Sequence, residues 1–189
     1  MFDFDFVEEI IATLESGGLI LYPTDSVWAI GCDATNVEAI KKILALKQRK
    51  EGEGLVLLAE DMKMVGNYVD YIPPRIDMLL VYHKRPLTVI YDLAENLPQE
   101  VLGAKNTVAI RTAQDDFCKN IVHKLGKPIV ATTANVDGQE IPLHFGAISS
   151  EIVEAVDYVV RFRRDDKKEG SLSVIACMGE DGELAFLRE

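Results

Sequence analysis

The chain has 189 residues, of which 48% are hydrophobic and 27% are charged, a composition that excludes a disordered or fibrous protein and suits one globular domain. The formal net charge of −11 argues against a large nucleic-acid surface, because phosphate binding needs clustered Lys and Arg. We therefore treat residues 1–189 as a single domain in which any anion site is local.

The start of the chain and the cysteines indicate a cytoplasmic protein. The first residues lack the basic stretch and long apolar run of a signal peptide, and no apolar segment approaches the roughly 20 residues of a membrane span. Cys32, Cys118 and Cys177 are odd in number, far apart and without zinc-ligand spacing. We expect reduced thiols, no membrane association and no metal site built from the protein alone.

Helices and strands are expected to alternate along most of the chain. Apolar residues at helical spacing, with Asn36 and Asp61 as N-caps, predict helices over residues 7–16, 36–47, 61–68, 73–83, 115–125 and 148–156. Short apolar runs predict strands over residues 19–22, 55–59, 86–91, 107–111, 129–131, 158–161, 172–176 and 184–187. A short turn at residues 179–182 favours an antiparallel hairpin. This pattern predicts an α/β fold, a twisted, open, mixed sheet with helices packed on it.

Two polar clusters stand where a predicted strand or helix ends, which is where open α/β sheets place their ligands. In residues 22–26 (YPTDS), the hydroxyls beside a proline can orient a small polar ligand, or they belong to a plain turn. In residues 47–50 (KQRK), the cations can clamp triphosphate oxygens, or they complement the helix dipole in solvent. Because no G-x-x-x-x-G-K-[ST] motif occurs, nucleotide binding would not use a P-loop.

A third cluster follows the apolar strand at residues 129–131. Thr133 and Asn135 are two positions apart and face the same way if the strand geometry continues, although an Asx turn explains them equally well. Arg111 directly follows another apolar strand, and a charge in that position needs a partner or a ligand.

No conventional catalytic set accompanies these clusters. His83, His123 and His144 are scattered and form no H-E-x-x-H motif, and we interpret His83 and His123 as helix-surface residues. There is no G-x-S-x-G motif, and we interpret Cys32 as a small buried residue. The sequence thus offers no candidate for covalent catalysis.

Five spaced blocks carry a more specific pattern. They are GLILYPTDSVWAIGCDA (18–34), LKQR with GLV (46–49 and 54–56), RPLT (85–88), VAIR (108–111) and KPIVATTANVDG (127–138). In this order they resemble the opening signature, the K-x-R segment, the P-G-P-x-T strand, the V-A-V-R strand and the K-P-I-V-A-T-S-A-N-x-S-G segment of the YrdC/YciO family. The resemblance runs over roughly residues 7–188, which makes chance a poor explanation.

The resemblance implies a YrdC-like α/β sheet with a concave, positively charged cavity, and the activity of a TsaC-type L-threonylcarbamoyladenylate synthase. Such an enzyme condenses L-threonine, bicarbonate or CO2, and ATP to threonylcarbamoyl-AMP and pyrophosphate. Its product serves tRNA modification to N6-threonylcarbamoyladenosine at position 37. Mg²⁺ would accompany the ATP, and the product would pass to a tRNA threonylcarbamoyl-transferase complex.

The resemblance also assigns roles to residues of this chain. Those that would bind threonine are Thr24, Ser26, Arg111, Thr133 and Ser173. Those that would bind the nucleotide are Lys47, Arg49, Asn135 and Arg188, and Lys47 and Arg49 would also be catalytic because they neutralise charge on the phosphates.

Some positions depart from the family pattern and leave other functions open. Thr133 replaces a serine, Glu53 stands where a neutral or basic residue is usual, Leu172-Ser173 replaces Ser-Thr, and Arg85-Pro86 lacks the preceding Pro-Gly. One alternative is a non-catalytic factor of the same fold that binds double-stranded RNA, tRNA or the ribosome. Another is a carbamoyl-adenylate enzyme of hydrogenase maturation, whose zinc and acylphosphatase modules are absent from this sequence.

Overall fold

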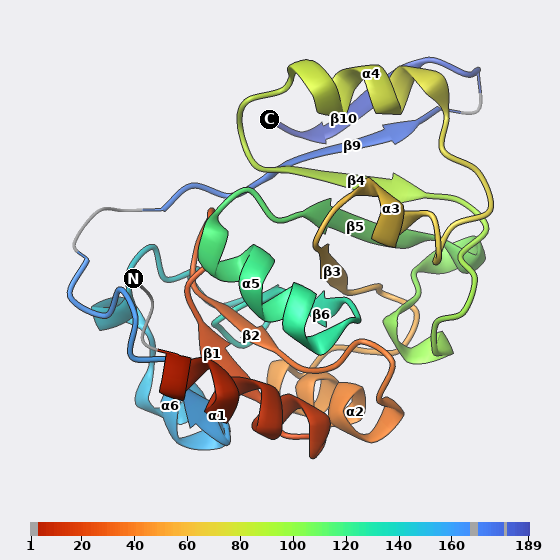
Figure 1. Cartoon of the computed structure of the whole chain (residues 1–189). Coiled ribbons are helices and arrows are strands. Elements are labelled where there is room, and N and C mark those ends of the chain that lie inside the picture. The colour runs from red at the N-terminus through yellow and green to blue at the C-terminus, as the bar shows by residue number, and fades with distance from the viewer. Residues whose placement is uncertain (1–3, 167–169, 180) are drawn as a thin grey trace.

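The computed structural model describes residues 4–166, 170–179 and 181–189, and its strands form two mixed sheets (Figure 1). The smaller sheet has the order β7-β2-β1-β8, with β1 at Ile20–Tyr22, β2 at Ala29–Gly31, β7 at Thr132–Thr133 and β8 at Tyr158–Val159. In it, β2 is antiparallel to both β1 and β7, and β8 is parallel to β1.

The larger sheet has six strands in the order β10-β9-β4-β5-β3-β6. Its strands are β3 (Val56–Ala59), β4 (Leu87–Tyr91), β5 (Val108–Thr112), β6 (Ile129–Val130), β9 (Val174–Met178) and β10 (Leu184–Arg188). The β3–β5 and β4–β9 pairs are parallel and the others are antiparallel. The expected hairpin is confirmed, because β9 and β10 pair across the turn that contains Gly179 and Gly182.

The two sheets are joined where β6 runs into β7. Only Ala131 separates these strands, and the Val130 amide donates a hydrogen bond to the Cys32 carbonyl just beyond β2. At this junction Gly31 is required, because a Cβ there would lie 2.6 Å from both a Tyr22 ring carbon and the Val130 carbonyl. The chain therefore crosses from one sheet to the other with little freedom to shift.

Within the described ranges, six α-helices cover the sheets: α1 (Phe4–Glu15), α2 (Val37–Lys47), α3 (Met62–Val65), α4 (Pro74–Tyr82), α5 (Asp116–Leu125) and α6 (Ser150–Ala155). Short 3₁₀ turns occur at Gln99–Val101, Ala104–Asn106 and Phe145–Ala147. In Figure 1, α1 lies next to β1 of the smaller sheet and next to α5, which also contacts β3 of the larger sheet, and α4 lies beside β9 and β10.

Helix α2 begins and ends through local backbone chemistry. The Asn36 side chain accepts a hydrogen bond from the Ala39 amide, as expected of the N-cap. At the other end Gln48 adopts the left-handed conformation (φ 55°), and the amides of Gln48 and Arg49 close the last turn on Ala45 and Leu44. This cap turns the chain directly after Lys47.

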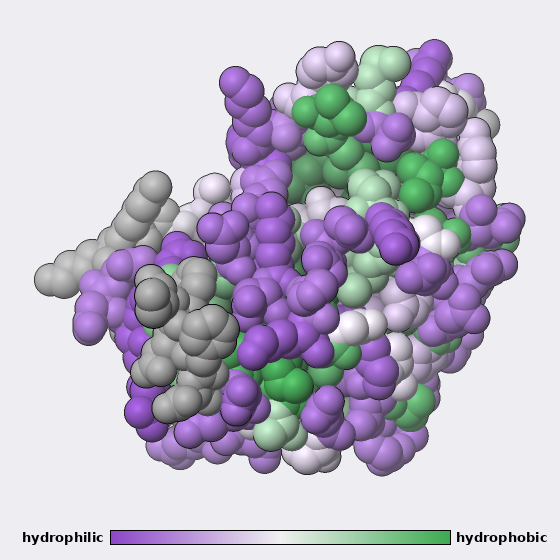
Figure 2. Space-filling view, viewed as in Figure 1, coloured by the Kyte–Doolittle hydropathy of each residue, from purple (hydrophilic) through white to green (hydrophobic). Residues whose placement is uncertain are grey.

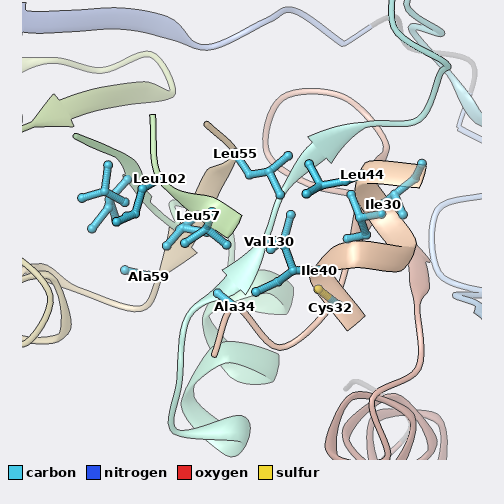
Figure 3. Close-up of a cluster of buried hydrophobic side chains, with 14 of the residues drawn as sticks. Ile30, Cys32, Ala34, Ile40, Leu44, Leu55, Leu57, Ala59, Leu102 and Val130 are labelled. Atoms are coloured by element: carbon cyan, nitrogen blue, oxygen red, sulfur yellow. The ribbon is translucent and has the colours of Figure 1, made fainter. Parts of the chain in front are cut away.

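The core holds the two sheets and α2 together. Figure 3 shows side chains of β2 (Ile30), α2 (Ile40 and Leu44), β3 (Leu57) and β6 (Val130) converging on one cluster, in which each is buried. A second cluster lies under α1 and α5 and includes Ile10, Leu14, Phe117 and Ile121. Burial of an aliphatic side chain contributes about 1.5–3 kcal/mol each, so these clusters fix the strand ends around the cavity described below.

The mixed α/β class and nearly all expected elements are confirmed, with differences that have physical reasons. The strands divide into two sheets because β2 and β7, which the sequence does not predict, pair with β1 apart from the larger sheet. The helix expected over residues 61–68 ends at Val65, although Asp61 caps it as predicted. Cys32 is buried, and all three cysteines are free thiols.

The surface assignment of the histidines is half correct. His123 is exposed and contacts Glu60, whereas His83 is only partly exposed and its buried Nε2 has no hydrogen-bond partner among the described residues. Helix α4 exposes Met78, Val81 and Tyr82, and Figure 2 shows apolar residues in the upper part of this face, where α4 lies. No helix among the described residues is long and apolar enough to span a membrane.

Candidate active site

A cavity with a volume of about 560 Å³ lies between the larger sheet and the connections of the smaller one. Strands β4, β5, β9 and β10 contribute Ile90, Ala109, Arg111, Ile175 and Arg188. The opposite wall comes from the residues around β2 and β7 and from the segment after α2, and includes Thr24, Ser26, Ala29, Arg49, Glu53, Gly54, Thr133, Asn135 and Asp137. The cavity thus brings together all but one of the site residues expected from sequence, and the exception is Lys47.

The connection between β1 and β2 supplies a compact hydroxyl pair. The Thr24 and Ser26 hydroxyls lie 2.9 Å apart, and the Thr24 hydroxyl also donates to the Val27 carbonyl at 2.8 Å. Because Thr24 is buried while Ser26 is partly exposed, Thr24 fixes the loop and Ser26 faces the cavity. The sequence left open whether residues 22–26 orient a ligand or form a plain turn. In the structure they form a turn, and the polar groups of Thr24 and Ser26 line the cavity.

Arg111 at the end of β5 reaches the same loop. Its Nη1 donates to Ser26 Oγ at 3.0 Å and to the Asp25 carboxylate, and the Gln114 amide donates to the other Asp25 oxygen at 3.0 Å. Burial raises the pKa of Asp25, and the Arg111 charge and the Gln114 hydrogen bond oppose this rise. The partner that sequence reasoning required for Arg111 is therefore Asp25.

The C-terminal hairpin delivers Ser173 and Arg188 to the same cavity. Arg188 donates through Nε to the Ser173 carbonyl at 2.8 Å and through Nη2 to its hydroxyl at 3.1 Å. The Ser173 hydroxyl also lies 2.8 Å from that of Thr88 on β4. Burial and then the positive charge of Arg111 lower the pKa of Arg188. Two guanidinium groups that repel across a cavity would be stabilised by an anion between them.

Lys47 lies beneath the cavity wall, with a side chain that has no exposed surface. Its Nζ donates to the carbonyls of Thr133 at 2.8 Å and Asn135 at 2.7 Å, and it lies 3.1 Å from Asp137 Oδ1. Burial lowers the pKa of Lys47, against the hydrogen bond and the charge of Asp137. The ammonium therefore organises the residues that follow β7.

Arg49 reaches the wall of the cavity directly. Its Nε donates to Asp137 Oδ2 at 2.5 Å and its Nη1 to the Gly54 carbonyl at 3.1 Å. The Asp137 carboxylate is thus shared by Lys47 and Arg49, and it is about one quarter exposed (28%). A guanidinium has five N–H donors, so Arg49 keeps donors for a ligand.

Thr133 and Asn135 are linked by their side chains, but not by the Asx turn considered from sequence, because the Asp137 amide donates to the Lys47 carbonyl and not to Asn135 Oδ1. The Thr133 hydroxyl donates to Asn135 Oδ1 at 2.6 Å, and Asn135 Nδ2 donates to the Gln139 carbonyl at 2.9 Å. Both residues line the cavity, so their hydrogen-bonded side chains form part of its wall.

Sequence reasoning did not single out Asp25, Thr88 or Asp137 as site residues. Asp25 lies within the polar cluster YPTDS (22–26), and Thr88 lies within the RPLT block (85–88). Asp137 had the clearest available signal, because the family-like segment carries an acid where the motif K-P-I-V-A-T-S-A-N-x-S-G has its second serine. Glu53, noted as a departure, does line the cavity.

The acidic residues of the cavity fit a metal that arrives with a ligand better than a resident one. No group of three or more His, Cys, Asp or Glu side chains suited to a metal occurs in the described part of the chain. Glu53 and Asp137 are the carboxylates in the cavity lining, and Asp137 is engaged by Lys47 and Arg49. Mg²⁺ commonly takes one or two carboxylates and completes its shell with phosphates and water, which this donor set allows.

Comparison with known proteins places the chain among enzymes of one activity. The threonylcarbamoyl-AMP synthase of Pseudoalteromonas translucida (strain TAC 125) is 32% identical over 163 residues, which are 85% of this chain and 87% of that protein. The protein of the same name from Vibrio campbellii (strain ATCC BAA-1116) is 32% identical over 135 residues, 70% of this chain and 73% of that protein.

Solved structures share the fold at low sequence identity. P. abyssi Sua5 complexed with L-threonine matches with a TM-score of 0.86 at 20% identity over 100% of this chain, which spans 55% of that protein. E. coli YciO matches with a TM-score of 0.85 at 19% identity, covering 99% of this chain and 90% of that one. Full-length HypF matches with a TM-score of 0.80 at 15% identity, but this chain spans only 28% of it.

The family resemblance of the five sequence blocks is confirmed over nearly the whole chain. The family model Sua5_yciO_yrdC, described as telomere recombination, matches residues 12–189. The chain therefore belongs to the Sua5/YciO/YrdC family.

Proposed function

We propose that this protein is a threonylcarbamoyl-AMP synthase, which condenses L-threonine, bicarbonate or CO2, and ATP to threonylcarbamoyl-AMP and pyrophosphate. The proposal rests on two groups of residues at one cavity. At one end the buried Arg111 lies beside the hydroxyls of Thr24 and Ser26. At the other end Arg49 lies close to the buried Lys47, and both contact Asp137. The activity is the one named for two relatives that are 32% identical to this chain over the aligned residues. We take residues 1–189 to act as one domain, since the two sheets share a core cluster.

The Arg111 end of the cavity suits an amino acid. A guanidinium can hold the threonine carboxylate with forked donors, and the hydroxyls of Ser26 and Thr24 beside it can orient the amine and side chain. Thr133 and Ser173 would complete this pocket from β7 and from the start of β9. P. abyssi Sua5, solved in complex with L-threonine, has the same fold, which agrees with this assignment.

The Arg49 end of the cavity suits the nucleotide. Arg49, with the positive charge of Lys47 behind it, would hold the phosphates, and Asn135 and Arg188 would contact other parts of ATP. The cavity lining contains three arginines and two carboxylates, so we expect its potential to be positive within an acidic chain. Mg²⁺ bound to the ATP would neutralise part of the phosphate charge, and Glu53, which lines the same cavity, would be a carboxylate available to contact it.

The reaction needs positioning more than proton transfer by a dedicated side chain. The threonine nitrogen attacks the carbon of CO2, or of bicarbonate with loss of hydroxide, and gives up a proton to form a carbamate. A carbamate oxygen then attacks the α-phosphorus of ATP, and the bond to pyrophosphate breaks. Arginines that hold the carboxylate and phosphates supply alignment and charge neutralisation, which explains why no His or Cys catalyst is required.

The chemistry of the product indicates which partner would receive it. A mixed anhydride of this kind hydrolyses readily, so we expect handover to a tRNA threonylcarbamoyl-transferase complex in the cytoplasm. Direct binding of tRNA or double-stranded RNA as the main function is not favoured, because the net charge is −11 and the curated relatives carry the name of a synthase. The hydrogenase-maturation alternative rests on fold likeness alone.

The test is pyrophosphate release by the purified protein with ATP, Mg²⁺ and bicarbonate, comparing threonine with serine. We expect release that depends on threonine and bicarbonate and that is reduced with serine. Arg111→Lys should abolish most of it, whereas the matched control Arg75→Lys, which changes an exposed ion pair with Glu183, should not. Release that is independent of threonine would contradict the proposal.

A further inference from the structure

We propose that Asp137 is an internal anion that covers the phosphate-binding cations Lys47 and Arg49, so that the polyphosphate of the nucleotide must displace it. This inference rests on the proposed function in one respect, namely that ATP phosphates bind at Lys47 and Arg49. It adds a residue that sets nucleotide affinity and pyrophosphate release.

The contacts show a carboxylate shared between two cations. Asp137 Oδ1 lies 3.1 Å from Lys47 Nζ, and Oδ2 accepts a hydrogen bond from Arg49 Nε at 2.5 Å. The Asp137 amide also donates to the Lys47 carbonyl at 3.0 Å, which holds the backbone close. One carboxylate therefore occupies the position that an anionic ligand of both cations would take.

The donors of Lys47 explain why displacement is needed. An ammonium has three N–H donors, and the close acceptors of Lys47 are the Thr133 carbonyl, the Asn135 carbonyl and Asp137. The two carbonyls belong to backbone between β7 and the following turn and cannot leave without breaking it. Of these three close acceptors, Asp137 is the one on a side chain, and it lines the cavity; the Thr133 hydroxyl and Asn135 Oδ1 lie farther from Nζ, at 3.5 Å each. A phosphate oxygen can therefore reach the ammonium only in place of the carboxylate.

The local sequence permits Asp137 to move. Gly138 follows it with a positive φ of 84°, and a Cβ at Gly138 would meet nothing within 4 Å, so there is open space beside the turn. The family motif K-P-I-V-A-T-S-A-N-x-S-G has serine at this position, and a neutral hydroxyl cannot neutralise two cations. Aspartate thus gives this chain an anion that the motif lacks.

Displacement has a defined consequence for binding. A ligand that binds only when Asp137 is turned away has its affinity reduced by the fraction of molecules in that state. Pyrophosphate and triphosphate carry several charges and can replace a carboxylate on both cations, whereas an uncharged nucleoside gains nothing from doing so. After the reaction, the return of Asp137 to Lys47 and Arg49 would favour the departure of pyrophosphate.

The test measures binding of Mg²⁺-pyrophosphate, Mg²⁺-ATP and adenosine to the wild type, Asp137→Ser and Asp137→Asn by titration calorimetry. If the turned-away state has a population of about one tenth or less, removing the carboxylate should tighten pyrophosphate and ATP binding by roughly tenfold or more. Adenosine affinity should stay the same. Weaker or unchanged binding of pyrophosphate in both variants would overturn the proposal and make Asp137 a support for Arg49.

The matched control is Glu51→Gln, which removes one negative charge from the exposed segment after α2, outside the cavity lining and without a described contact to Lys47 or Arg49. It should tighten pyrophosphate binding less than about threefold, and a change equal to that of Asp137→Ser would mean that only the overall field matters. If the variants fold poorly, a crystal structure of the wild type with pyrophosphate decides. Separation of Asp137 from both cations supports displacement, and an intact pair overturns it.

This experiment is independent of the threonine chemistry. If pyrophosphate binding tightens in Asp137→Ser but no threonine-dependent turnover is found, the proposed function fails while the role of Asp137 stands. If turnover is found and pyrophosphate binding does not tighten, the role of Asp137 fails alone.

Discussion

Arg111 and Asp25 join the two sheets beside the cavity. Arg111 lies in β5 of the larger sheet and Asp25 lies in the connection between β1 and β2 of the smaller one, and their side chains are only 4% and 8% exposed. The same guanidinium reaches the Ser26 hydroxyl at 3.0 Å. The ion pair therefore aims Arg111 at the loop that we assign to threonine.

Asp25→Ala should destabilise the fold because it leaves the Arg111 charge buried without its partner. Removing one member of a buried ion pair costs about 3–5 kcal/mol, and Asp25→Asn, which keeps an acceptor, should cost less. Urea denaturation of the three proteins measures this difference. Glu38→Ala breaks an exposed ion pair with Lys41 and should change the free energy of unfolding by less than about 1 kcal/mol. An equally small change in Asp25→Ala would contradict the pairing.

Much of the fold could be predicted because its signals are local. The N-caps at Asn36 and Asp61 are set by residues three positions away, and the structure confirms both. The two- and three-residue strands β2 and β7 could not be predicted, because such short strands show no periodicity and exist through pairing with β1 and with each other.

The candidate site likewise contains residues that could be predicted from sequence and residues that could not. The hydroxyls and cations that line the cavity could be recognised from strand ends and motif blocks. Their partners could not, since Asp25 lies 86 residues from Arg111 and Asp137 lies 88 residues from Arg49. The burial of Lys47 was also beyond sequence, because it depends on where the turn after β7 folds back over α2. Charge compensation between distant segments is a property of the fold.

The stability contributed by Asp137 should disappear in acid. Burial would raise the pKa of this carboxyl, but hydrogen bonds from Arg49 and Lys47 and their charges lower it below its ordinary value of 3.8. Because the folded state favours the ionised form, the stabilisation is complete above pH 3.8 and is lost as the pH falls through the lower folded value. The difference in unfolding free energy between the wild type and Asp137→Ser, measured in urea, should be constant at neutral pH and shrink in acid. A difference that grows in acid would contradict this.

Gly170→Ala should impair turnover by moving the Ser26 loop. A Cβ at Gly170 would overlap the Ser26 carbonyl oxygen, which is backbone and cannot rotate away. Misplacement of a substrate-binding group by about 1 Å can cost roughly 100-fold in rate, so we expect threonine-dependent pyrophosphate release to fall at least about tenfold. Gly66→Ala is the control, because its Cβ would meet only ordinary contacts of 3.5 Å or more. Full activity of Gly170→Ala would show that the loop tolerates the shift.

Arg188→Lys should weaken the site although it keeps the positive charge. Arg188 uses Nε and Nη2 on the carbonyl and hydroxyl of Ser173, which leaves Nη1 for the cavity. A lysine has one nitrogen and cannot hold Ser173 and face a ligand at once. We expect kcat/KM for ATP to fall by about tenfold or more, which corresponds to about 1.4 kcal/mol of lost transition-state stabilisation. Arg75→Lys is the matched control on the surface, and an equal loss in both variants would mean that Arg188 acts only through net charge.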